Sequence, residues 1–214
     1  MTQPSTLVFD LDGTISDNSV GIVRSINYAL SAFGYQTVAE DAVAQYIGPP
    51  LDTVFSGITQ SDSSDRVRDL VVKFRERYSD VGYAENTVYA GIPEVLQHLS
   101  SRGAQMGICT GKRADFAGRI LTMFGLREHF SFVRGGNLGV RKVDQLRALL
   151  DERAIEPGSI MIGDRAVDIA AARSNGLRSV GVLWGHGSEQ ELTDAAPDRV
   201  FALPEQLRGL IYNP

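Results

Sequence analysis

Cysteine is nearly absent from the chain, which has Cys109 alone among 214 residues. A lone cysteine cannot form a disulfide within the chain, so no oxidising compartment is required and the expected location is the cytoplasm. Lysine is also scarce. Of the 21 basic residues only Lys73, Lys112 and Lys142 are lysines, and the other 18 are arginines. A lysine at a defined position is therefore unusual in this sequence.

Long apolar runs and an excess of basic charge are also missing. No apolar stretch approaches the roughly 18–20 residues that cross a bilayer, and the start MTQPSTLVFD lacks the basic region of a signal peptide. The net charge of −5 disfavours nucleic acid as the main partner. With 43% hydrophobic and 22% charged residues, the composition is that of a folded globular protein. We therefore expect the protein to act on a small molecule and to bind neither membranes nor nucleic acid.

Short apolar runs alternate with helical spacing over most of the chain, which predicts an α/β fold. The first run, Leu7 to Phe9, ends in Asp-Leu-Asp-Gly and has the pattern of a buried strand. The other expected strands are Ala104–Cys109, Phe130–Val133, Ser159–Ile162 and Ser179–Leu183. The expected helices between them are Ile92–Ser101, Asp115–Phe124, Val143–Glu152 and Val167–Ser174. The alternation predicts a doubly wound, mostly parallel, Rossmann-like sheet covered by helices on both faces.

Residues 16–87 break this alternation and form an expected helical insertion. Apolar residues recur at helical spacing from Val20 to Leu30 and again from Val67 to Phe74. A capping-box pattern at Thr37–Glu40 predicts a further helix, and Gly48–Leu51 forms either a specificity loop or a plain turn. We expect two domains: a catalytic α/β core from residues 1–15 and 88–214, and a helical cap from residues 16–87.

Acidic residues follow the first strand. Asp10 and Asp12 flank Leu11, so the period of two sends both carboxylates to one side and Leu11 to the core. Two like charges in one small site are costly unless a cation or a proton compensates them. The alternative is that one aspartate caps a turn while the other is solvated. The following Gly13-Thr14 makes that alternative weaker.

A second acidic pair follows the strand that ends at Ile162. Asp164 is expected at the strand tip and Asp168 one helical turn later. By themselves the two could equally be a helix N-cap and a first-turn acid. Together with Asp10 and Asp12 they predict a Mg²⁺ site, since Mg²⁺ takes a few carboxylate or carbonyl oxygens and keeps water and phosphate as its other ligands.

Two further strand and helix ends carry groups suited to an anion. Thr110 and Gly111 follow Cys109 and offer a hydroxyl and an amide, although Thr110 could instead be an N-cap. Lys142 lies at the start of an expected helix, where the helix dipole disfavours a cation. A positive charge at this unfavourable position indicates a functional role. An exposed surface lysine is the alternative, and Arg141 or Lys112 could take the same role.

Cys109 is expected to be buried and inert. His98, His129 and His186 lack the spacing of metal ligands and are assigned no catalytic part, while the role of Arg165 stays open.

In this order, four short segments resemble the four motifs of the haloacid dehalogenase superfamily of phosphotransferases. The segments are Asp10-Leu-Asp12-Gly-Thr14, Thr110, Lys142 and Gly163-Asp164-x-x-x-Asp168. Residues 16–87 look like the small helical cap that this superfamily inserts behind its first strand. The stretch from Gly163 to Gly187 is similar to the branch of phosphoglycolate phosphatases and 5′-nucleotidases.

The resemblance implies a role for each motif residue. Asp10 would be the nucleophile that forms an aspartyl-phosphate, and Asp12 would be the general acid and base. Thr110 and nearby amides, with Lys142, would hold and neutralise the phosphoryl group. Asp164 would bind Mg²⁺ together with the Asp10 carboxylate and the Asp12 carbonyl, with Asp168 supporting the site from behind.

The implied activity is Mg²⁺-dependent hydrolysis of small phosphate monoesters, with phosphoglycolate or a 5′-nucleotide as leading substrates, by a monomer or small homo-oligomer. A sugar-phosphate mutase of the same superfamily is an alternative. A phosphonate hydrolase with a Schiff-base lysine is weak, because Lys73 is the only lysine in the cap and has no special context. A signalling receiver domain is the alternative from another class, but it carries no long helical insertion after its first strand.

Overall fold

The computed structural model describes residues 6–47, 49–61, 63–136 and 140–211, and these divide into two compact units. The first unit contains residues 1–17 and 88–214, and the second contains residues 18–87. At the boundary, β2 (Ser16–Asp17) pairs with β3 (Thr87–Val88) as a two-stranded sheet. None of the described helices is long and apolar enough to cross a bilayer.

The first unit is built on a six-stranded sheet with the order β5-β4-β1-β6-β7-β8. Its strands are β1 (Leu7–Phe9), β4 (Met106–Cys109), β5 (Phe132–Arg134), β6 (Ile160–Gly163), β7 (Arg178–Val182) and β8 (Arg199–Phe201). Every neighbouring pair is parallel. The strands β1, β4 and β6 are buried on both faces, which explains their uninterrupted apolar sequences.

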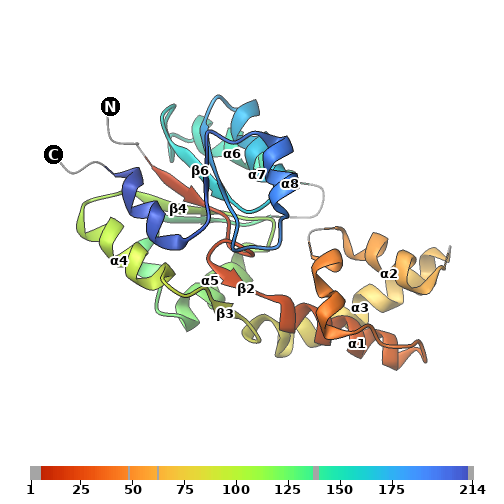
Figure 1. The fold of residues 1–214 in the computed structure, drawn as a ribbon. Helices are drawn as coiled ribbons and strands as arrows, with labels where there is room; N and C mark the ends of the chain where they lie inside the picture. Colours follow the sequence, from red (N-terminus) through yellow and green to blue (C-terminus); the bar gives the residue numbers. More distant parts are fainter. Residues whose placement is uncertain (1–5, 48, 62, 137–139, 212–214) are drawn as a thin grey trace. The chain divides into compact units, whose positions relative to one another are not determined.

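Helices cover both faces of this sheet (Figure 1). The helices are α4 (Ile92–Ser101), α5 (Ala114–Met123), α6 (Lys142–Asp151), α7 (Ala166–Ser174) and α8 (Glu189–Ala195), with 3₁₀ turns η3 (Arg127–His129) and η4 (Pro204–Leu210). The chain builds outward from β1 through β4 to β5, then crosses over and continues through β6 to β8. Figure 1 shows α4 and α5 on one face and α6 and α7 on the other, as the general preference for right-handed crossovers leads one to expect. The predicted doubly wound α/β fold is confirmed.

The second unit has a helical core of its own. Its elements are α1 (Ser19–Ala32), η1 (Glu40–Tyr46), α2 (Leu51–Thr59), α3 (Ser64–Asp80) and η2 (Gly82–Ala84). Phe55 of α2 meets Phe74 of α3 edge-on, and Phe74 stacks on Tyr78. Fully buried Leu30 and Leu70 bring α1 and α3 into the same cluster. The apolar residues at helical spacing in this segment therefore pack together as a core between the helices.

The helix predicted from Thr37–Glu40 is present, but it is a 3₁₀ helix and it begins at Glu40 instead of just after Thr37. Residues 35–39 are irregular and are followed by the 3₁₀ segment η1. The side chain of Asn27 explains this, because its amide donates to the carbonyl of Val38 and accepts from the N–H of Val38, at 2.9 and 2.8 Å. These two bonds hold Val38 against α1, and the 3₁₀ helix begins two residues later. Gly48, in the proposed loop Gly48–Leu51, lies outside the described residues.

Cys109 ends β4 and is fully buried, and its thiol donates to Gln145 Oε1 of α6 at 3.3 Å. Burial raises the pKa of this thiol to about 12.

We predict that a thiol reagent at pH 8 labels the folded protein very slowly, because roughly one thiol in 10⁴ is ionised when the pKa lies four units above the pH. The labelling rate, followed by absorbance with and without urea, should rise steeply when the protein unfolds. Rapid stoichiometric labelling of the folded protein would contradict the assignment of Cys109 to the core.

Candidate active site

Three strand ends meet at one edge of the sheet. Residue Phe9 of β1 is paired with Ile108 of β4 and with Ile162 of β6, so the residues just beyond these strands are neighbours. Asp10 follows β1 directly, and Asp164 follows β6. Parallel α/β sheets bind ligands at the carboxyl ends of their strands, at the point where the strand order reverses.

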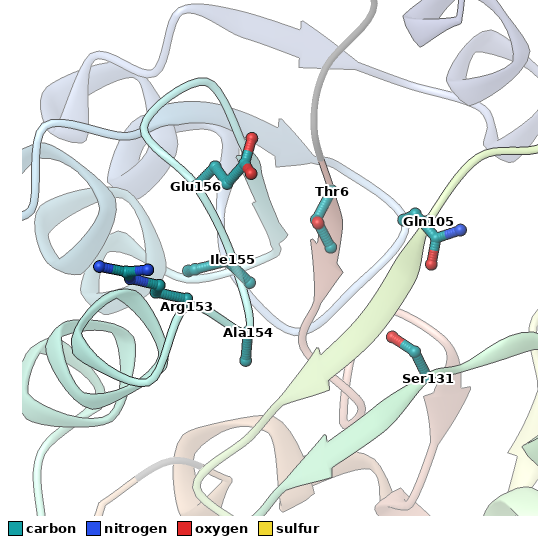
Figure 2. A pocket seen from close by; sticks show the side chains of 7 residues that line it. All are labelled: Thr6, Gln105, Ser131, Arg153, Ala154, Ile155 and Glu156. Carbon is teal, nitrogen blue, oxygen red and sulfur yellow. The ribbon is translucent and has the colours of Figure 1, made fainter.

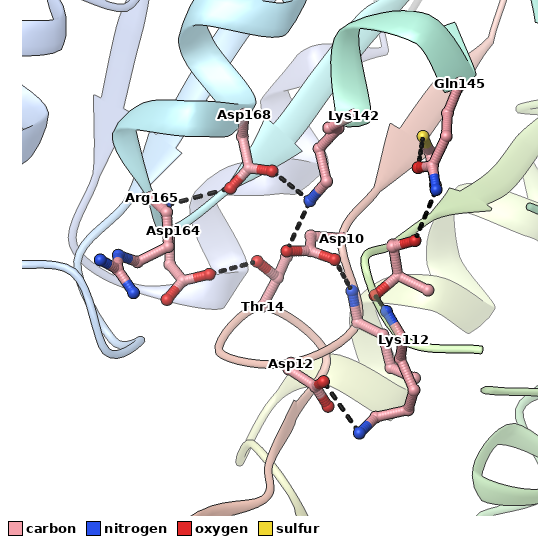
Figure 3. A network of polar contacts seen from close by, with 12 residues as sticks. Asp10, Asp12, Thr14, Lys112, Lys142, Gln145, Asp164, Arg165 and Asp168 are labelled. Carbon is pink, nitrogen blue, oxygen red and sulfur yellow. Dashed lines mark hydrogen bonds and ion pairs between the residues drawn. The ribbon is translucent and has the colours of Figure 1, made fainter. Parts of the chain in front are cut away.

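Lys142 lies among the acidic side chains, at the first position of α6 (Figure 3). Its ammonium Nζ is 2.8 Å from Asp10 Oδ2 and also pairs with Asp168 Oδ1. Burial alone would lower the pKa of Lys142, but the two carboxylates outweigh burial and hold this pKa above its usual value. Only 6% of the side chain is exposed, so Lys142 is not a surface lysine. Arg141, the alternative, pairs with Asp144 and is 76% exposed.

Asp164 and Asp168 are held in fixed orientations. Asp164 Oδ2 accepts from the N–H of His186 at 2.8 Å, and Asp164 Oδ1 accepts from the hydroxyl of Thr14 at 3.3 Å. Asp168 Oδ2 accepts from the N–H of Arg165 at 3.1 Å. The N-cap residue of α7 is Arg165, so the alternative that Asp164 caps this helix is excluded.

The donor set of this cluster suits a hard divalent cation. Oxygens of Asp10, Asp164 and Asp168 lie within 4.8 Å of one another. When all three carboxylates are ionised, they and the ammonium of Lys142 leave two net negative charges. Burial, with the nearby charge of Asp10, raises the pKa of Asp164 to about 6, as expected for an acid whose charge is uncompensated. Carboxylate oxygens and two excess charges match what Mg²⁺ requires.

Asp12 stands apart from the three clustered carboxylates. Its Oδ2 is 3.0 Å from the ammonium of Lys112, and the Lys112 side chain is 7% exposed. Burial raises the pKa of Asp12, while Lys112 opposes the rise. The two buried lysines therefore divide the carboxylates, Lys142 with Asp10 and Lys112 with Asp12.

Thr110 follows β4 at the same edge and is 1% exposed. Its Oγ1 accepts from the N–H of Lys112 at 3.3 Å, and its carbonyl accepts from Gln145 Nε2 at 3.2 Å. The N-cap residue of α5 is Arg113, so Thr110 is not the N-cap. Gly111 comes next and is exposed. All the strand-tip residues singled out in the sequence are thus found along one edge of the sheet.

A loop after β7 contributes contacts that sequence reasoning missed. Trp184 Nε1 donates to the carbonyl of Thr14 at 3.0 Å, and the backbone N–H of His186 binds Asp164. Backbone contacts of this kind carry no signal in residue type. Arg165 points its guanidinium at Glu191, 2.9 Å away, so it supports the start of α7. Glu191 also escaped sequence analysis, since an acid in a first helical turn is common.

A hollow of about 280 Å³ lies at the opposite edge of the sheet from the acidic cluster (Figure 2). Its lining residues Thr6, Gln105 and Ser131 directly precede β1, β4 and β5, and residues 153–156 precede β6. These are the amino ends of the strands, and none of the clustered carboxylates reaches them. The acidic cluster, at the carboxyl ends, is therefore the candidate active site.

Comparison with known proteins shows the family to which the chain belongs. The family model described as haloacid dehalogenase-like hydrolase matches residues 7–182, and the chain belongs to this family. It is 36% identical to a 5′-nucleotidase of Pseudomonas aeruginosa over 97% of this chain and 95% of that protein. It is 30% identical to a phosphoglycolate phosphatase of Vibrio parahaemolyticus, covering 91% and 90% of the two chains. The solved structure of protein tyrosine kinase A of Mycobacterium tuberculosis is similar, with a TM-score of 0.82, 30% identity and coverage of 98% and 99%.

Gly13 provides a test of how tightly the site is packed. Its φ is +79°, and a Cβ at this position would lie 2.1 Å from Asp164 Oδ2. Gly103 is a matched control, with φ +77° and no heavy atom within 4 Å of its added Cβ.

We predict that Gly103→Ala loses only the cost of the left-handed backbone, about 1–2 kcal/mol. Gly13→Ala should lose a further ~1–3 kcal/mol, because the methyl group must displace a buried carboxylate. Urea unfolding of both variants measures the difference. Equal losses would show that the loop can move away from Asp164 freely.

Proposed function

We propose that this protein is a Mg²⁺-dependent phosphatase that hydrolyses small phosphate monoesters through an aspartyl-phosphate on Asp10. The pairing of Asp10 with Lys142 at the tip of β1, beside Asp164, is the observation that carries the proposal. A phosphate dianion approaches a carboxylate only where cations offset both charges. The family, and the names of the two relatives, support hydrolysis of a phosphate ester.

The metal ligands in this proposal are the carboxylates of Asp10 and Asp164 and the backbone carbonyl of Asp12. Asp168 stands behind them, because its oxygens are already bound by Lys142 and by the N–H of Arg165. Bound Mg²⁺ would screen the negative charge of the nucleophile and of the phosphoryl group.

The reaction then proceeds in two half-reactions on residues of the first unit. In the first, an Asp10 carboxylate oxygen bonds to phosphorus, the ester P–O bond breaks, and Asp12 gives its proton to the departing oxygen. In the second half-reaction, a water molecule gives a proton to Asp12 while the water oxygen bonds to phosphorus. The bond between phosphorus and Asp10 breaks, and inorganic phosphate leaves. One group thus serves as acid and then as base.

Thr110, Gly111 and Lys142 form the phosphate-binding part of the site. The hydroxyl of Thr110 and the amide of Gly111 follow β4, where an anion can be held by donors at a strand end. Lys142 keeps its charge, because its pKa is held high, and would neutralise phosphoryl oxygens as well as Asp10.

The helical segment, residues 16–87, is proposed as the cap that selects the substrate, with the Gly48–Leu51 loop as a candidate contact for the leaving group. The relatives' names make phosphoglycolate and 5′-nucleotides the leading substrates. The thiol of Cys109 is buried and forms no disulfide, which is compatible with a cytoplasmic enzyme.

A panel of phosphate monoesters tests this function. We predict release of inorganic phosphate from several esters with Mg²⁺, and loss of turnover in excess chelator that added Mg²⁺ restores, because two excess negative charges otherwise repel the substrate. Undiminished turnover in chelator would refute the metal assignment. A mutase would return an isomeric sugar phosphate, a receiver domain would keep its phosphoryl group, and a kinase would transfer it to tyrosine.

Two substitutions separate the roles of the first two aspartates. Asp10→Asn should abolish both turnover and the phosphorylated adduct, because the amide is a poor nucleophile. Asp12→Asn should keep the nucleophile but slow turnover by roughly 10²–10⁴-fold, the usual contribution of general acid–base catalysis. Asp144→Asn, on the exposed pair with Arg141, is the control and should leave turnover unchanged. Acid-quenched mass spectrometry detects the adduct, and an adduct on Asp10→Asn would move the nucleophile elsewhere.

A further inference from the structure

Lys112 is a buried cation that the phosphatase motifs leave without a role. Its side chain is 7% exposed, whereas that of Lys73, the lysine of the helical unit, is 31% exposed. The next residue, Arg113, pairs with Asp115 and is 66% exposed. The loop after β4 therefore buries one cation and leaves its neighbour in solvent. Burying an ammonium is unfavourable unless a partner compensates it.

The partner of Lys112 is Asp12, and the two oxygens of this carboxylate have different surroundings. Oδ2 is 3.0 Å from the Lys112 ammonium. Oδ1 is buried and accepts no hydrogen bond from the part of the chain that the structure describes. A buried carboxylate oxygen without a partner is costly. Its persistence suggests that Oδ1 is kept for a group that arrives with the substrate.

The backbone of Lys112 is held as firmly as its side chain. Its N–H donates to Thr110 Oγ1 at 3.3 Å, and its carbonyl accepts from the N–H of Gly136 at 2.8 Å. The same short loop therefore positions both the hydroxyl of Thr110 and the partner of Asp12.

We propose that Lys112 is a positioning residue for Asp12, which fixes Oδ2 and so directs Oδ1 toward the oxygen of the leaving group. This inference rests on the proposed function. Lys112 acts on the proton transfer, whereas Lys142 acts on the nucleophile and the phosphoryl group. Breaking the ester P–O bond leaves an electron pair on the departing oxygen, and that oxygen takes the proton from Asp12 Oδ1.

The need for this proton depends on the leaving group. An alkoxide is a strong base and departs only as the alcohol, whereas nitrophenolate is a weak base and departs without a proton. Loss of correct positioning should therefore slow alkyl esters more than a nitrophenyl ester. A residue that simply binds the phosphoryl group would affect both esters alike. The comparison is made in kcat/KM, which covers the steps up to departure of the leaving group.

The experiment compares Lys112→Gln with Lys112→Arg and with the control Lys73→Gln, using an alkyl phosphate and p-nitrophenyl phosphate with Mg²⁺. For Lys112→Gln we expect kcat/KM to fall by roughly 10–100-fold on the alkyl ester, part of the general-acid contribution. On the nitrophenyl ester the fall should be at most a few-fold. Lys112→Arg should recover part of the loss, and Lys73→Gln should match the unsubstituted protein on both esters. Circular dichroism and urea unfolding confirm that each variant is folded.

A double-mutant cycle provides a second readout. With Asp12→Asn already present, Lys112→Gln should cause little further loss on the alkyl ester, because the group it positions is gone. Equal losses on both esters, or full additivity with Asp12→Asn, would overturn the inference, as would no loss on either ester. Failure of the proposed function itself has a different signature, namely no phosphate released from either ester by the unsubstituted protein.

Discussion

The crowding of carboxylates around one buried ammonium is the constraint on which the rest of the site depends. Asp10, Asp164 and Asp168 would repel one another in a region almost without solvent, and Lys142 offsets part of their charge by pairing with two of them. The parallel sheet supplies the geometry, since β1 and β6 are adjacent and end at the same level. In the proposed function, the charge that Lys142 leaves uncompensated attracts a cation, and that cation in turn attracts phosphate.

The choice of lysine over arginine follows from this geometry. A compact ammonium can bind one carboxylate on each side, as Lys142 does, whereas the planar guanidinium is suited to bidentate contact with a single carboxylate. Arginines elsewhere in the chain make such bidentate contacts. Arg77 makes two bonds to Glu85, and Arg113 makes two to Asp115. A sequence with 18 arginines and three lysines thus places two of its lysines in the one region where a small point charge is needed.

The sequence carries the fold class clearly because apolar runs and helical spacing are local properties. The predicted helix Ile92–Ser101 matches α4 at both ends, and the predicted strand ends lie within two residues of those observed. Strand ends in turn indicated that Asp10 and Asp164 would be neighbours. The contacts of Lys112 and of the His186 amide were not predictable, because they depend on how the loops beyond the strand ends pack. The late start and 3₁₀ form of the helix predicted at Thr37 also depend on tertiary contacts, since Asn27 of α1 makes two hydrogen bonds to the backbone of Val38.

The division of the chain has a consequence for how such an enzyme can change its substrate. Every side chain to which the proposed function gives a part in phosphoryl transfer lies in residues 1–17 or 88–214. The helical unit has a separate apolar core, centred on residues such as Phe55 and Leu70. Substitutions within residues 18–87 therefore need not disturb the charge balance around Lys142, which tolerates little change. Under the proposed function, the first unit keeps one chemistry while the helical segment adapts to different leaving groups, which agrees with relatives of similar identity that carry different names.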